Sequence, residues 1–139
     1  MMSAPRLALI AALALLAACQ SEPSAEVPAA AAAASEKSAA LRNMEQVAIA
    51  AHRCWFASRD PVFAGYSFAN ELNSFSGQPR FLLVPRGDFG GRPLLVVQAS
   101  GAAGTVTSFG PLLDGAAGSR IRGDIARFAS GDASCGTSA

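Results

Sequence analysis

The chain has 139 residues, with 11 Lys and Arg against 10 Asp and Glu, and a formal net charge of +1. A chain of this length supports one domain. Its near-neutral balance lacks the basic surface that displaces counterions from nucleic acid or binds anionic lipid headgroups, so we expect neither kind of partner for the folded part.

The first nineteen residues have the pattern of an export signal. Arg6 supplies a positive charge, an uninterrupted apolar run follows over residues 7–18, and Cys19 comes after two small residues. A charged start, an apolar middle and small residues before a cleavage point are typical of a secretory signal peptide. The run has 12 residues, whereas a helix needs about 20 to cross a bilayer. We therefore predict that residues 1–18 are a signal peptide.

The segment Leu16–Cys19, which reads LAAC, resembles the lipobox of bacterial lipoproteins. In that family the cysteine thiol is diacylated, the peptide is cut just before it, and the new amine receives a further acyl chain of the palmitate type. The resemblance implies that Cys19 is the lipidated first residue of the mature protein; the alternative is an ordinary signal peptide with a chance cysteine. Gln20 stands where aspartate would favour inner-membrane retention, so the resemblance implies the outer membrane, facing the periplasm.

Residues 19–37 have the composition of a linker. Alanine, proline, serine and glutamate dominate, and Val27 is the one large apolar residue after Cys19. Such a segment cannot bury enough apolar surface to offset the entropy of ordering it, so we predict a flexible tether. The run Ala29–Ala34 favours helix and could extend the following helix upstream.

Residues 38–56 give the clearest helical signal. Apolar residues recur there at i, i+3, i+4 and i+7, which makes one apolar stripe. The stripe consists of Leu41, Met44, Val47, Ala48, Ala51, Cys54 and Trp55. The helix must end before Asp60, because the residue that precedes a proline is disfavoured in helical conformation.

The middle of the chain predicts a β-meander. Residues 62–75 look irregular, with a short strand near residues 66–69. Three strands then follow at residues 80–85, 93–99 and 105–109, joined by the glycine-rich segments 86–92 and 100–104. Loops this short join antiparallel strands.

The first two of these three strands are apolar on both faces, since FLLV and LLVV do not alternate with polar residues. Continuous apolar runs indicate cover on both sides of a sheet. Either the two helices lie on opposite faces in a closed monomer, or they share one face. In the second case the other face presents an apolar patch of several hundred Å² to a partner.

A second helix is predicted after Asp114. Its apolar positions at helical spacing are Ala117, Ile121, Ile125 and Phe128. The charged residues expected to point outward are Arg120, Arg122, Asp124 and Arg127. Asp114 is the expected N-cap and Gly131 the expected C′ residue. Gly118 and Gly123 each cost about 1 kcal/mol relative to alanine, so this helix should depend on packing.

Cys54 and Cys135 remain once Cys19 is set aside. An even number of cysteines in an exported chain predicts a disulfide. The bond would close a loop of about 80 residues, worth about 4–5 kcal/mol in the chain-entropy model. The alternatives are two buried thiols or a redox pair, although the usual C-x-x-C spacing of a redox pair is absent.

Few residues suggest catalysis or metal binding. His52, the single histidine, is two positions from Cys54, and residues at i and i+2 point to different sides of a helix. The carboxylates are scattered at positions typical of turns and caps; those weighed are Asp60, Glu71, Asp88, Asp114, Asp124 and Asp132. We therefore expect no catalytic residue, no metal site and no cofactor.

The predicted fold is α+β. It comprises an N-terminal helix, an antiparallel meander of three to four strands, a C-terminal helix and one disulfide. Residues 38–135 form the single domain, and residues 136–139 a disordered tail. In this organisation the mature domain resembles uncharacterised small exported lipoproteins.

The expected function is that of a non-enzymatic interaction or structural module, held at the membrane by its lipid and binding an envelope protein or peptidoglycan. Four aromatic residues are the candidate interaction surface: Phe63, Tyr66, Phe75 and Phe89. The alternative is a small periplasmic enzyme or ligand carrier, which needs a pocket with convergent polar groups. Its candidates are His52, Tyr66, Asp88 and Arg92.

Overall fold

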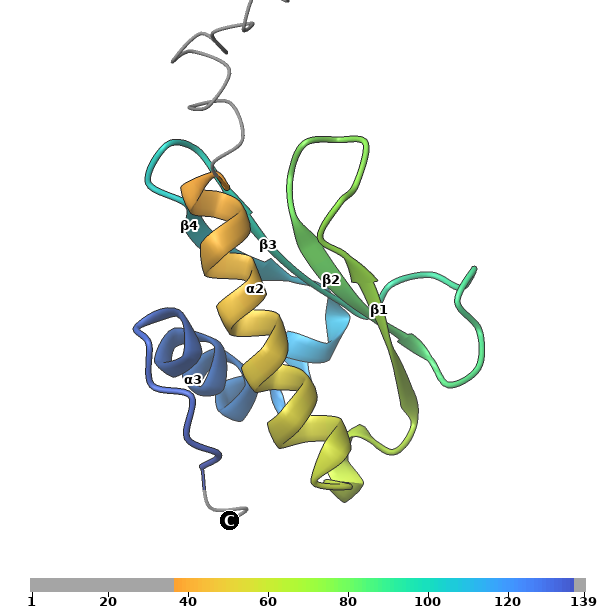
Figure 1. Ribbon diagram of the computed structural model, residues 1–139. Coiled ribbons are helices and arrows are strands. Elements are labelled where there is room, and N and C mark those ends of the chain that lie inside the picture. The colour runs from red at the N-terminus through yellow and green to blue at the C-terminus, as the bar shows by residue number, and fades with distance from the viewer. Residues whose placement is uncertain (1–36, 137–139) are drawn as a thin grey trace, which may run out of the picture. The chain divides into compact units, whose positions relative to one another are not determined.

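A four-stranded antiparallel sheet with two α-helices makes up the part of the chain that the computed structural model describes, residues 37–136 (Figure 1). The strands follow one another in sheet order: β1 (Tyr66–Glu71), β2 (Arg80–Pro85), β3 (Leu95–Ser100) and β4 (Thr105–Phe109). This confirms the α+β class and the antiparallel meander. The predicted signal peptide, Cys19, all of the tether except Lys37, and residues 137–139 lie outside the described residues.

The first helix in this part of the chain is α2 (Ala39–Ala51), which continues as the π-helical segment η1 (His52–Ala57). Ser38 caps α2, because its Oγ accepts a hydrogen bond from the Leu41 N–H (3.1 Å). The helix ends at Ala57, before Asp60, as the following proline predicts. Asp60 instead caps the short 3₁₀ helix η2 (Pro61–Phe63).

The second helix, α3 (Gly118–Ala129), ends as predicted but begins differently. Gly131 has φ +97°, and its N–H donates to Phe128 O (3.1 Å) while Asp132 N–H donates to Arg127 O (3.2 Å), which is a Schellman motif. The prediction for Asp114 was wrong. It lies in a separate 3₁₀ helix, η3 (Pro111–Asp114), which forms because Leu113 is buried and Leu112 N–H bonds to Leu94 O.

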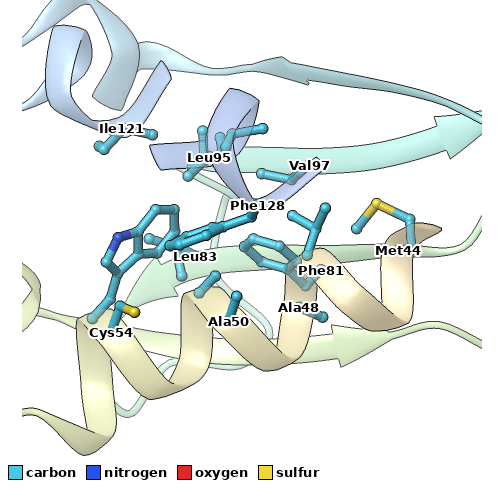
Figure 2. Close-up of a cluster of buried hydrophobic side chains, with 14 of the residues drawn as sticks. Met44, Ala48, Ala50, Cys54, Phe81, Leu83, Leu95, Val97, Ile121 and Phe128 are labelled. Carbon is cyan, nitrogen blue, oxygen red and sulfur yellow. The ribbon is translucent and has the colours of Figure 1, made fainter. Parts of the chain in front are cut away.

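Both helices pack on the same face of the sheet, so of the two arrangements considered from the sequence, the one with helices on opposite faces was wrong. Figure 2 shows side chains of α2, η1 and α3 meeting those of β2 and β3 in one core. The labelled members are Met44, Ala48, Ala50, Cys54, Phe81, Leu83, Leu95, Val97, Ile121 and Phe128. Neither α2 nor α3, nor any other helix within residues 37–136, is long and apolar enough to cross a membrane.

The opposite face of the sheet carries a second, smaller buried cluster of Leu82, Val84 and Val96, with Ala69 packed beside it. These three side chains are at most 8% exposed, so the large exposed apolar patch expected there is not what the structure shows. In register, Leu82 lies opposite Ala69 on β1 and Val96 on β3. Polar residues flank the cluster, including the Arg80–Glu71 ion pair (2.6 Å), and they keep the apolar area small.

Candidate interaction groove

The four aromatic residues predicted as an interaction surface do not form one surface. Phe63 is 1% exposed because its ring stacks on Trp55 in the core, with centroids 4.6 Å apart. Tyr66 is half-buried against the same core. Phe75 and Phe89 are exposed, but they lie in the β1–β2 and β2–β3 loops, which leave β2 at opposite ends. These two therefore do not join each other, or Phe63 and Tyr66, in one surface.

The structure instead has an open groove of about 500 Å³ between the α2–η1 helix and strand β1. We call it the α2–β1 groove. Most of its lining is apolar, and Ile49 contributes a side chain that is 68% exposed. The lining residues are Ala48, Ile49, His52, Arg53, Ala57, Phe68, Asn70 and Leu72. Sequence reasoning missed this site because Ile49 falls off the apolar stripe of the helix, and an isolated exposed isoleucine is ordinary.

The groove exists because α2 packs on β2, β3 and β4, whereas β1 extends beyond it. In Figure 1, α2 crosses the sheet with α3 on one side and β1 on the other. The His52 ring meets Phe68 edge-on at 5.4 Å and stacks with Phe56 at 6.0 Å. Within η1, Cys54 and Trp55 are buried while His52 and Arg53 remain exposed.

Strand β1 is an edge strand of the sheet. Arg86 N–H donates to Gly65 O (3.0 Å). Since hydrogen-bonded and non-bonded pairs alternate along antiparallel strands, Tyr66, Phe68 and Asn70 direct their N–H and C=O groups away from β2. The groove therefore lies beside backbone groups that have no strand partner within the described residues.

The charged lining of the groove is of one sign only. Arg53 is the one arginine or lysine in its lining, and no carboxylate lines it. The Arg53 guanidinium donates to Ala133 O, which anchors it and uses one of its five donors. The groove can thus offer hydrogen bonds and positive charge to an anionic group.

The other side of α2 is sealed by polar contacts that the helical pattern did not predict. Asp124, expected to point outward, is 5% exposed. Its carboxylate accepts hydrogen bonds from Trp55 Nε1 (2.8 Å) and from Arg127 (2.7 Å). A buried indole N–H needs an acceptor, and the acceptor is 69 residues away in the chain.

A second carboxylate joins this network through Arg120. The Arg120 guanidinium pairs with Asp60 and lies 3.7 Å from Asp124. The hydrogen bond from Arg120 holds the pKa of Asp60 below its usual value, and the same contact raises the pKa of Arg120. Two of the six carboxylates judged scattered from sequence, Asp60 and Asp124, thus meet around one arginine, where their role is to bind two helical segments together.

The disulfide predicted between Cys54 and Cys135 is present and closes this same side. It links η1 to the segment that follows α3. The Cys54 sulfur is bonded to Cys135 and buried, while His52 is exposed and lines the groove. The two do not form a nucleophile–base pair.

The residues considered for an enzyme or carrier are dispersed. His52 lines the α2–β1 groove, and Tyr66 lines a separate hollow of about 260 Å³. Asp88 and Arg92 lie in the exposed β2–β3 loop and line neither. Within residues 37–136, no group of three or more His, Cys, Asp and Glu side chains is arranged to hold a metal ion.

Comparisons with protein-family models, with curated proteins and with solved structures found no match to this chain. The interpretation of the groove therefore depends on its geometry and chemistry alone.

Proposed function

We propose that the protein is a lipid-anchored, non-enzymatic interaction module of the bacterial envelope, attached to the outer membrane through Cys19 and facing the periplasm. The observation that carries the proposal is the Cys54–Cys135 disulfide, because such bonds persist in oxidising compartments and are rare in the cytosol. The lipobox-like Leu16–Cys19 segment and the tether composition support the same placement.

The α2–β1 groove supports the interaction part of the proposal. Proteins usually shield the edge strands of their sheets, because an unpaired edge pairs readily with another chain. Here the edge of β1 lies beside an open apolar groove with Ile49 at its rim. Small-molecule sites are concave and bury most of their ligand, so an open groove suits a macromolecular partner, either an envelope protein or peptidoglycan.

The anchoring is tested by mass spectrometry and membrane fractionation of the native protein and its Cys19→Ser variant. We expect the native protein to lack residues 1–18, to carry three acyl chains and to sediment with the outer membrane, since more than one chain gives stable anchoring. Cys19→Ser should lose the acyl chains and membrane attachment. Gln20→Asp is the matched control, which should stay lipidated but move to the inner membrane. A native protein with an unmodified Cys19 would contradict the proposal.

The interaction is tested in the same cells with a photo-crosslinking residue placed at position 49, 75 or 89. These positions are exposed, so the substitutions should not disturb the core. A reproducible crosslinked partner from any of them supports an interaction module. The absence of one from all three counts against it.

A further inference from the structure

We propose that the α2–β1 groove binds an extended peptide segment of a protein partner, which joins the sheet as a fifth strand beside β1. The segment is apolar at alternate positions and carries a carboxylate. The inference depends on the proposed interaction function and goes further by naming the chemistry of the partner.

The main chain of the segment would pair with the free edge of β1. Tyr66, Phe68 and Asn70 turn their N–H and C=O groups away from β2, and an extended chain at the usual strand spacing of about 4.8 Å can bond to all three. Strand addition of this kind gives affinity through the backbone, and pockets for alternate side chains give specificity.

The side chains of the segment would alternate between the groove and the opposite face. Residues directly opposite one another in an antiparallel pair point to the same face of the sheet. Phe68 and Asn70 line the groove, so the partner residues that face them also enter it, to meet Ile49 and Leu72. This geometry predicts an apolar residue at every second position.

The charge of the groove selects the carboxylate. Arg53 is the one arginine or lysine of its lining, and none of its lining residues is acidic. A guanidinium presents donors in a planar fork that matches a carboxylate. An aspartate, a glutamate or a free C-terminus of the partner near Arg53 would complete the pairing.

The opposite edge of the sheet, strand β4, is arranged differently. Helix α2 packs over β4, and Asn43 Nδ2 donates to Gly104 O (2.8 Å) in the β3–β4 turn. The backbone of that turn comes so close to Ala39 that a Cβ built on Gly104 would lie 2.6 Å from Ala39 C. The helix thus occupies at β4 the position that stays open at β1.

The test uses the mature lipidated protein in detergent micelles and a phage-displayed library of random linear peptides. We expect selected peptides to alternate apolar residues and to contain Asp or Glu. Ile49→Glu should weaken binding of the best peptide at least about tenfold, as expected for loss of one buried apolar contact. Arg53→Ala should weaken the acidic peptides more than their Asn or Gln analogues. Phe89→Glu, in the β2–β3 loop, is the matched control, because Phe89 is 66% exposed against 68% for Ile49; it should bind within about twofold of the native protein.

Amide hydrogen exchange distinguishes strand addition from binding in the groove alone. A bound peptide should slow exchange of the Tyr66, Phe68 and Asn70 amides. Binding that leaves these three amides unchanged would overturn the proposal, as would a library that yields no peptide sensitive to Ile49→Glu.

Three other results would also overturn it while leaving the proposed function standing. A dimer of the mature protein that Ile49→Glu dissociates would make a second copy the occupant. Tighter peptide binding after deletion of residues 20–36 would make the tether the occupant. A partner crosslinked in cells from position 75 or 89, but never from position 49, would place the interaction elsewhere.

Discussion

The two sides of the α2–η1 helix differ in what they leave unsatisfied. On the closed side, the buried Trp55 and Asp124 bond to each other, Arg120 connects Asp60 to α3, and the Cys54–Cys135 bond ties the ends together. On the open side, the α2–β1 groove has apolar side chains and the free edge of β1. The closed side pairs its polar groups within the fold, whereas the open side leaves the outward N–H and C=O groups of β1 for another molecule.

The comparison suggests a division of roles between the two sides. Buried polar groups with complete hydrogen bonding make an arrangement specific and rigid. Exposed Ile49 and a half-buried Phe68 contribute less to folding, because much of their apolar surface stays in water. Substitutions on the closed side should therefore lower the stability of the fold, and those on the open side should change binding.

The largest loss of stability should follow from Cys135→Ser. The bond joins residues 81 apart in sequence, for which the chain-entropy model gives about 4–5 kcal/mol and measured losses run about 2–5 kcal/mol. Guanidinium unfolding of the variant should show a loss in this range. The native protein under strong reductant should match the variant. If reduction leaves the unfolding midpoint unchanged, the closed side does not depend on the bond.

A pair of glycine substitutions in α3 gives the next largest effect and carries its own control. A Cβ on Gly118 would lie 1.8 Å from Leu113 O of η3, whereas a Cβ on Gly123 meets nothing within 4 Å. Gly118→Ala should destabilise by about 1–3 kcal/mol through overpacking, and Gly123→Ala should stabilise by about 1 kcal/mol through helix propensity. Thermal unfolding of both variants measures the difference. Equal effects would mean that α3 does not approach η3 closely.

The same two glycines show what could be predicted from the sequence and what could not. Local pattern located β2 and β4 residue by residue, because apolar and β-branched runs are bounded by glycine turns. It also located α2, the end of α3 and the disulfide partners. It assigned Gly118 and Gly123 the same cost, since helix propensity does not depend on what packs against the residue.

The remaining errors concern contacts between distant segments. The periodicity of α3 grouped Asp124 with the outward charges, although Trp55 draws it into the core. The apolar runs of β2 and β3 indicated how much surface needs cover but not which face the helices take. The α2–β1 groove depends on the direction in which α2 crosses the sheet, which no local pattern encodes.

The smallest predicted effect is the pH dependence of folding stability that arises from Asp60. The hydrogen bond from Arg120 lowers the pKa of Asp60 in the folded state, so between the folded and unfolded pKa values the unfolded chain binds more protons. The stabilisation is fully present above the unfolded pKa of about 3.9 and is lost as the pH falls through the folded value.

Urea unfolding as a function of pH should show native protein and Asp60→Asn differing most in stability near neutrality, with the difference closing below about pH 4. The difference in stability between native protein and Arg120→Gln should depend on pH in the same way, because either substitution removes the Asp60–Arg120 pair. Ile49→Gln, on the open side, should keep the native profile. A gap between native protein and Asp60→Asn that is constant with pH would mean that the contact stabilises the fold through packing and not through charge.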